Sequence, residues 1–402
     1  MADTPLAQDS QPQLHLFSRL YEGTSIVTAQ SLATSVKWVR EWYQWFYPSS
    51  LKPNFVKVYE CRPQLPISIF FPRGYDQTLP QALPTVFIIH GGGFCMGSPE
   101  DDDVWSERFA TMHNVLVVEL NYRKAPAHPF PTATYDLEAL MLAVFNDESL
   151  PVDKSRIAVG GFFAGGNLTL SVCQLPSIHD EVRPAAVVAI YPLVDQTIHT
   201  REKLKMRYYK PDLKRGIRGR SSDLLAGWGQ TFRWSYIPIG HDLRDPLLSP
   251  YFALRDDLPP HVFLIGAELD HLSHEAWRMA NKLANRAVPP FTEMAGQEKP
   301  ACDSDSLILD DERFAFEQVD VGGKKSVRWL LVPDEAHGFD HFSTSFYSSE
   351  EAARGAHLKT VAYQKLVGQW LHNRAWIASP RPLARAGQDA PSIQTDPAGS
   401  NS

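Results

Sequence analysis

The sequence contains no apolar run long enough to cross a lipid bilayer. Among its 402 residues no stretch of about 18 apolar residues occurs, which is roughly the length that a spanning helix requires. Residues 1–10 lack the basic start and the apolar run of a signal peptide. The four cysteines are too few and too scattered for a disulfide framework. We therefore expect a cytoplasmic protein in a reducing compartment, without stable membrane insertion.

An excess of charge of either sign is also absent. The net charge is −7 and charged residues make up 21% of the chain, which argues against nucleic acid or an anionic membrane as a partner. The exception is local, because residues 201–220 hold nine Lys or Arg against two acids. We expect this basic segment to be a solvated surface insertion, and whether it closes over a pocket stays open.

Short apolar runs alternate with amphipathic stretches along most of the chain. Apolar residues make up 44% of it, enough for a sizeable core. Continuously apolar runs, typical of strands buried on both faces of a parallel sheet, occur at 85–89, 115–120, 157–159, 186–190, 262–265 and 327–332. Residues 133–145 and 275–284 have helical spacing between such runs. The pattern predicts an α/β fold with a mostly parallel sheet.

The same patterns predict five regions. Residues 1–54 should form a loose polar tail followed by cap helices, and residues 196–235 a cap insertion. Two parts of one core, 55–195 and 236–376, flank that insertion, and the second contains a polar surface excursion at about 295–325. The segment 377–402 has the Pro- and Gly-rich composition of a disordered tail.

Residues 161–166 have the spacing of a nucleophile elbow but contain no nucleophile. In a G-x-S-x-G elbow a serine stands on a sharp turn between a strand and a helix, between small flanking residues. Here Gly161 and Gly165 are present, but Phe163 takes the place of the serine. A phenyl ring cannot attack an acyl carbon, because nucleophilic catalysis needs a heteroatom lone pair. Ordinary serine hydrolysis is therefore not expected.

A glycine-rich loop lies about 70 residues before this elbow. His90-Gly91-Gly92-Gly93-Phe94 leaves successive backbone N–H groups unobstructed, so the loop can hold an oxyanion. Loop and elbow together resemble the hormone-sensitive-lipase branch of the α/β-hydrolases. Further segments are similar to motifs of that branch, in the same order along the chain: 121–131 (Y-R-x-A-P-x-H-P-F-P), 245–250 (D-P-L-x-S-P), 266–272 (the catalytic acid) and 334–339 (H-G-F).

This resemblance covers residues 55–375 and implies an α/β-hydrolase fold, with a mostly parallel central sheet flanked by helices. A helical cap would come from the N-terminus and from the insertion after the sixth strand. The resemblance assigns the base to His337, the acid to Asp270 and the oxyanion hole to the N–H groups of Gly91, Gly92 and Ala164.

The departure from the family falls on the elbow, where the branch has Asp-Ser and this chain has Phe162-Phe163. We expect both rings to line the pocket and to make its floor apolar. Cys95 and Cys173 are expected to be packed thiols rather than substitute nucleophiles. His271 and His274 form an H-x-x-H pair, but with no third ligand in sight we expect no metal and no cofactor.

These features predict an α/β-hydrolase-like enzyme of specialised metabolism. A base, an anion hole and an apolar floor suit cyclisation, elimination or dehydration of a hydrophobic small molecule rather than hydrolysis. Related cyclases and dehydratases support this by analogy only. Two alternatives stay open: a catalytically silent ligand-binding protein, as in the similar gibberellin receptors, and an ester hydrolase with an unconventional nucleophile. A homodimer is also left open.

Overall fold

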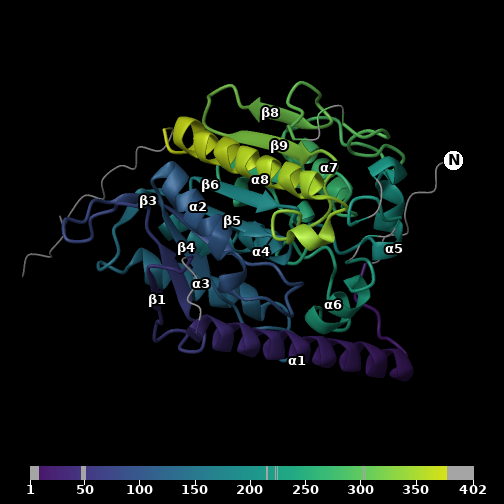
Figure 1. Cartoon of the computed structure of the whole chain (residues 1–402), viewed down its shortest axis with the longest axis horizontal. Helices are drawn as coiled ribbons and strands as arrows, with labels where there is room; N and C mark the ends of the chain where they lie inside the picture. Colours follow the sequence, from purple (N-terminus) through teal and green to yellow (C-terminus); the bar gives the residue numbers. More distant parts are fainter. Residues whose placement is uncertain are drawn as a thin grey trace, which may run out of the picture.

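The computed structural model describes residues 9–46, 51–213, 216–221, 223, 225–301, 303 and 305–377. Of the predicted disordered tail, 377–402, only the first residue lies within the described part. Figure 1 shows a central sheet covered by helices on both faces, with one long helix along an outer edge of the molecule.

The sheet has nine strands in the order β1-β2-β4-β3-β5-β6-β7-β9-β8. The six inner strands run parallel, and β1, β2 and β8 join antiparallel at the two edges. Their bounds are β1 Phe55–Lys57, β2 Ile67–Phe70, β3 Leu83–Ile89, β4 Leu116–Leu120, β5 Val152–Phe162, β6 Ala186–Ile190, β7 His261–Ala267, β8 Ala315–Val319 and β9 Ser326–Val332. Each of the six predicted apolar runs lies in one of the parallel strands, so these predictions are confirmed.

Helices cover both faces of the sheet, which explains why the inner strands are apolar along their whole length. One face packs against α2 Asp103–His113 and α8 Glu350–Trp370. The other packs against α3 Thr132–Phe145, α4 Ala164–Val172 and α7 Ser273–Leu283. Helices α3 and α7 correspond to the two amphipathic stretches found in the sequence.

The edge strand β8 corrects the prediction that residues 295–325 are only a surface excursion. Residues 315–319 pair antiparallel with β9 in this segment. Only Phe316 of β8 is buried, so the strand lacks the continuous apolar run by which the inner strands were recognised. An edge strand is solvated on one side and its sequence stays polar.

The N-terminal region forms one helix, α1 Leu16–Phe46, rather than several cap helices. The residues before it are not all loose, because Gln11 is buried and its backbone N–H donates to the carbonyl of His241 at 3.0 Å. Within the described residues, no helix combines the length and the apolar content that crossing a bilayer requires.

The cap insertion, residues 196–235, contains α5 Thr200–Lys203 and most of α6 Gly229–Tyr236. The prediction that the basic segment within it, residues 201–220, is solvated is wrong for four of its cations. Lys203, Arg207, Lys210 and Arg218 are buried. Lys210 Nζ lies 2.8 Å from Glu268 and 2.7 Å from Asp334.

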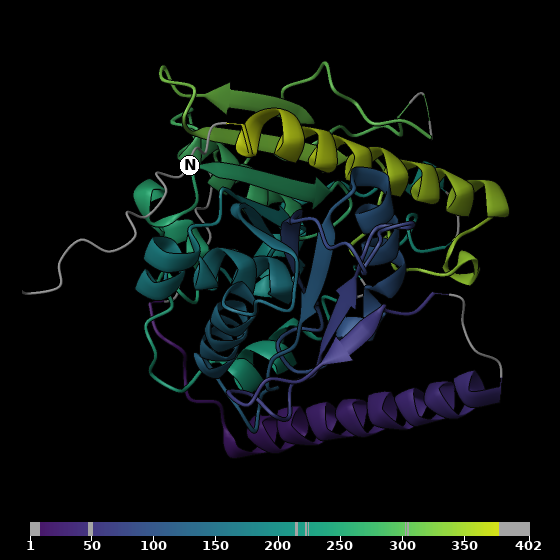
Figure 2. The ribbon, with the colours of Figure 1, turned by 90° about the vertical axis from the view of Figure 1, so that its left-hand side faces the viewer.

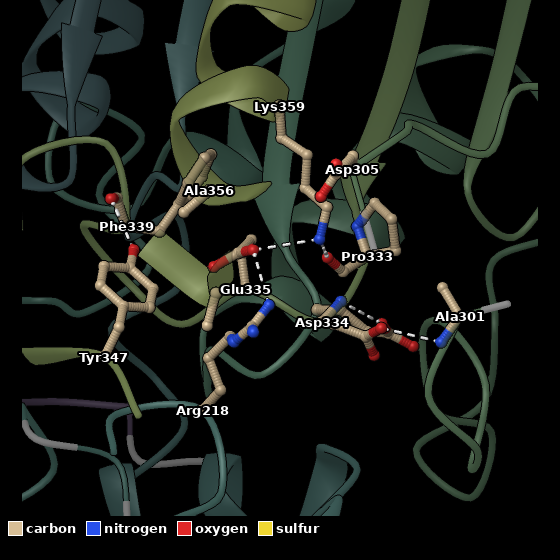
Figure 3. Close-up of polar contacts among 12 residues, drawn as sticks. Arg218, Ala301, Asp305, Pro333, Asp334, Glu335, Phe339, Tyr347, Ala356 and Lys359 are labelled. Carbon is tan, nitrogen blue, oxygen red and sulfur yellow. Dashed lines mark hydrogen bonds and ion pairs between the residues drawn. The ribbon is translucent and has the colours of Figure 1, made fainter. Parts of the chain in front are cut away.

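Arg218 contacts the buried carboxylate of Glu335 at 3.3 Å, and Lys359 of α8 approaches the same carboxylate at 3.0 Å (Figure 3). These acids follow β7 and β9, so the insertion is fastened to the edge of the sheet by ion pairs. Arg201, Lys205 and Arg220 are exposed as expected, and residues 214–215 lie outside the described part.

Candidate active site

Three predicted site residues meet at the carboxyl edge of the sheet. Phe163 follows β5, Asp270 lies just after β7, and His337 lies beyond β9. In open α/β sheets the carboxyl ends of parallel strands are where ligands bind. The order β5-β6-β7-β9 therefore brings together residues that are far apart in the sequence.

His337 and Asp270 form a buried hydrogen-bonded pair. His337 Nδ1 lies 2.7 Å from Asp270 Oδ2, and the exposed fractions of the two side chains are 8% and 0%. The other carboxylate oxygen accepts a bond from the backbone N–H of Leu272 at 2.9 Å. An acid bound to Nδ1 fixes the imidazole and leaves Nε2 to exchange a proton.

The elbow keeps its sharp turn although it carries a phenylalanine. Phe163 has φ 52° and ψ −109°, and α4 begins at the next residue. The turn is tightly enclosed, because a Cβ on Gly165 would lie 2.0 Å from the carbonyl oxygen of Ile89. A Cβ on Gly161 would lie 2.5 Å from the carbonyl oxygen of Gly165. The turn has therefore not relaxed to suit the larger side chain.

The ring of Phe163 packs against the imidazole of His337. It meets the His337 imidazole edge-on, with 4.6 Å between ring centroids and 83° between planes. On another side of that imidazole lies Tyr191, whose centroid is also 4.6 Å away. Among the described residues, His337 hydrogen-bonds only to Asp270.

Phe162 does not line the pocket, which corrects the prediction for this residue. Its side chain is 2% exposed and packs against Trp105 and His341, in the cluster under α2 and α8. Successive side chains of an extended chain point to opposite faces, so Phe162 and Phe163 diverge at the end of β5.

The glycine loop runs directly beside the elbow. A Cβ on Gly91 would lie 3.7 Å from Cβ of Phe163. Gly92 has φ +104°, and a Cβ there would be 2.2 Å from the carbonyl oxygen of Met96, so only glycine fits this position. Ala164 is the first residue of α4 and is fully buried. The three predicted oxyanion residues thus flank the turn that carries Phe163.

A pocket opens between the elbow, the glycine loop and the insertion. It is narrow, with about 40 Å³ open to the centres of water-sized molecules. Its lining includes Gly93, Phe94, Phe163, Phe232, Tyr236 and His271. Sequence patterns did not point to Phe232 or Tyr236, because they belong to the helix α6 of the insertion and reach the site only through the fold.

His271 forms a second histidine–carboxylate pair that the sequence did not predict. His271 Nδ1 lies 2.8 Å from Asp223 of the insertion and 3.4 Å from Asp270. The hydrogen bond and the charge of Asp223 outweigh desolvation and raise the pKa of His271, and the pair holds the pKa of Asp223 below its usual value.

The predicted H-x-x-H pair does not converge on one point. His274 Nε2 faces the carbonyl oxygen of Pro290 at 3.3 Å, away from the His271 contacts. Asp223, Asp270 and His271 do place ligand-type atoms within 4.8 Å of one another. His271 Nδ1 is hydrogen-bonded to the carboxylate of Asp223. The three residues therefore form a hydrogen-bonded cluster.

The two cysteines considered as substitute nucleophiles are packed thiols, as predicted. Cys95 and Cys173 are both buried. Burial raises the pKa of the Cys95 thiol to about 12 and raises that of Cys173 as well. A thiol that stays protonated near neutral pH is a poor nucleophile.

Comparison with known proteins agrees with this architecture. A family model described as alpha/beta hydrolase fold matches residues 86–298. An arylesterase of Saccharolobus solfataricus is 30% identical over 210 residues, covering 52% of this chain and 64% of the relative. An ethyl acetate hydrolase of Pseudomonas putida is 31% identical over 230 residues, covering 56% and 67%. The chain thus spans about two thirds of the length of these relatives.

Solved structures show the same fold. An ester hydrolase from the metagenome of Lake Arreo superposes with a TM-score of 0.55 at 25% identity, covering 79% of this chain and 84% of the other. An esterase of Pyrobaculum calidifontis gives a TM-score of 0.58 at 21% identity, covering 90% and 99%. With the family match over more than half of its length, the chain belongs to the α/β-hydrolase fold family, on its hormone-sensitive-lipase-like branch.

Proposed function

We propose that this protein is an enzyme that performs acid/base chemistry on the carbonyl group of a hydrophobic small molecule, without a serine nucleophile. The observation that carries the proposal is the buried His337–Asp270 pair at 2.7 Å, retained beside a phenyl ring. In this proposal Phe163 replaces the nucleophile serine of the family.

Each proposed role follows from the position of its group. His337 takes up and returns a proton through Nε2, and Asp270 orients the ring and stabilises its protonated form. The N–H groups of Gly91, Gly92 and Ala164 stabilise an enolate or alkoxide oxygen. The aromatic wall formed by Phe163, Phe232 and Tyr236 excludes water and favours an apolar substrate.

Loss of the nucleophile removes attack but not proton transfer. Deleting the serine of a cooperating triad lowers kcat on the order of a millionfold. Cyclisation, elimination and dehydration need no covalent acyl intermediate, so a base and an anion site are sufficient for them.

The base is tested with a small apolar proton donor. Purified protein should open 5-nitrobenzisoxazole by removal of its carbon-bound proton, and His337→Gln should lower that rate by roughly 10²–10⁴-fold, the contribution usual for a positioned base. His357→Gln, at an exposed position of α8, is the matched control. Equal rates in His337→Gln and wild type would reject His337 as the base and favour a silent ligand-binding protein.

Ester hydrolysis is the second candidate, because the relatives are named for it. It would require a nucleophile other than residue 163. We expect neither turnover of p-nitrophenyl acetate nor labelling by a fluorophosphonate in the wild-type protein. A covalent adduct in the wild type would establish this second candidate instead.

The role assigned to Phe163 has its own test. Phe163→Ser should create fluorophosphonate labelling and ester turnover, because the new hydroxyl would stand on the sharp turn beside His337. Phe163→Ala removes the ring without adding a nucleophile and should remain unlabelled. Absence of labelling in a correctly folded Phe163→Ser protein would show that the turn does not present its side chain to His337.

A further inference from the structure

The described contacts of the long helix α1 with the rest of the molecule lie on one face. On its inner side Gln30 donates from Nε2 to the carbonyl oxygens of Cys95 at 2.9 Å and Ala125 at 2.8 Å. The hydroxyl of Thr231 in α6 donates to the buried carboxylate of Glu22 at 2.5 Å. Both views place α1 along the periphery, on the side of the molecule away from α8 (Figures 1 and 2).

The opposite face of α1 carries a seam of exposed uncharged residues. The positions alternate at spacings of four and three: Phe17, Tyr21, Thr24, Thr28, Ser31, Ser35, Trp38 and Trp42, all of them exposed. This is the 3.5-residue repeat by which two helices pack along each other. The four aromatic side chains expose 65–83% of their surface, and further exposed apolar residues border the seam, namely Leu16, Leu20, Val27, Leu32 and Val39.

Three of the four hydroxyl groups of the seam are hydrogen-bonded within the helix. Thr24 donates to the carbonyl of Leu20 and Thr28 to that of Thr24, each at 2.7 Å, and Ser35 donates to Ser31 at 2.8 Å. A polar group that already has a partner costs little to remove from water. Burial of these three hydroxyl groups against a second helix therefore costs little.

The seam is a palindrome about the midpoint between residues 29 and 30. Reversing it exchanges Phe17 with Trp42 and Tyr21 with Trp38, aromatic for aromatic. The same operation exchanges Thr24 with Ser35 and Thr28 with Ser31, small hydroxyl for small hydroxyl. A surface that matches itself on reversal fits an antiparallel two-fold contact, with small residues at the axis where the backbones approach most closely.

We propose that α1 is a dimerisation helix, which packs antiparallel along α1 of a second copy of this chain. Exposed aromatic and aliphatic side chains present on the order of 1,000 Å² on this face, taking roughly 150–250 Å² for each aromatic ring. A stable interface buries about 800 Å² on each partner, and patches on monomers rarely exceed about 600 Å². The seam has no charged residue, so two copies meet without repulsion.

A second copy fits this face better than a lipid surface does. Interfacial helices combine an apolar face with many Lys and Arg that bind anionic headgroups. In this chain the outer seam has no basic residue and the net charge of the protein is −7. The bilayer is therefore treated as the competing outcome of the experiment.

The arrangement is tested by cysteine cross-linking of the full chain, in a background carrying Cys61→Ser and Cys302→Ser. In an antiparallel pair residue 24 faces residue 35 of the second copy. The double variant Thr24→Cys/Ser35→Cys should form a disulfide-linked dimer on oxidation, and each single variant should remain a monomer on a non-reducing gel. A dimer formed by Thr24→Cys alone would overturn the antiparallel orientation.

The oligomeric state is measured by light scattering on the unmodified chain, with an expected mass of twice the 45.2 kDa of one chain. Trp38→Glu should halve this mass and leave the circular dichroism spectrum unchanged, since the side chain is 74% exposed. A monomeric mass at all concentrations would overturn the proposal. Flotation of the wild-type chain with phosphatidylcholine vesicles would also overturn it, if Trp38→Glu abolishes that flotation. The outer face of α1 would then bind a bilayer rather than a second copy.

Discussion

Phe163 has a backbone conformation that a bulky residue seldom adopts. At φ 52° and ψ −109° it carries a strain of roughly 1–3 kcal/mol. The close contacts of Gly161 and Gly165 force the turn irrespective of the residue on it. Packing of the ring against His337 and Phe232 offsets part of the strain. A turn built for one exposed side chain has thus kept its geometry while the chemistry of that side chain changed.

Also at the residue scale, the His271–Asp223 pair predicts a pH-dependent contribution to stability. The folded pKa of His271 is raised above its ordinary value near 6.5, so its contribution is complete below that pH and is lost as pH rises through the raised pKa. His271→Gln should therefore cost about 1–2 kcal/mol at pH 6 and less at pH 9, as for a hydrogen bond to a charged group. Urea unfolding at both pH values measures this, with the exposed His15 changed to Gln as control. An equal loss at both values would contradict the assignment.

At the scale of elements, buried ion pairs hold the basic segment 201–220 against the edge of the sheet. Lys203, Lys210 and Arg218 each contact a buried carboxylate that lies at or beyond the end of β7 or β9. Burying a charged group is costly unless it is paired. The insertion therefore has a strong preference for the position in which these pairs form, and in that position α6 forms part of the pocket wall.

Removing one of these cations should be far more damaging than removing an exposed one. Lys210→Met leaves Glu268 and Asp334 without their shared cation, which should cost about 3–5 kcal/mol of unfolding free energy. Lys205→Met, at a side chain that is 69% exposed and paired with Glu202, should cost less than about 1 kcal/mol. Urea denaturation of both variants compares them. Similar losses of unfolding free energy in the two variants would contradict a larger contribution from the buried ion pairs of Lys210.

At the scale of the whole molecule, two separate surfaces carry the proposed functions. The carboxyl ends of the parallel strands carry the candidate site, and the outer face of α1 carries the proposed dimer contact. Gln30 connects these regions, since it is bonded to the carbonyl of Cys95, two residues beyond Gly93 of the glycine loop. Pairing of two copies would thus restrain the helix that packs behind this loop.

A dimer of folded chains should melt in a concentration-dependent manner. Each tenfold increase in protein concentration should raise the Tm by about 1 °C, because association stabilises only the folded state. Trp38→Glu should show no such dependence. Differential scanning calorimetry over a hundredfold range of concentration provides the measurement, and a constant wild-type Tm would contradict a dimer that dissociates on unfolding.

Local signals in the sequence determined the inner sheet and the identity of the main pair. Runs such as Ala186–Ile190 are apolar because both faces are covered, and that requirement is visible in a single segment. His337 and Asp270 could be predicted because each lies in a short segment that resembles a motif of the family. The glycines at 92 and 165 could also be recognised as turn residues, since close approach of the backbone excludes every other residue there.

Only the tertiary structure decided which way neighbouring side chains face and which distant charges meet. Phe162 and Phe163 look alike in the sequence, yet one enters the core and the other contacts His337, because successive side chains at the end of β5 point to opposite faces. Lys210 looks like part of a solvated basic run until Glu268 and Asp334 are seen on either side of it. Burial and pairing depend on contacts between segments far apart in the chain, and composition of one segment carries no information about its partners.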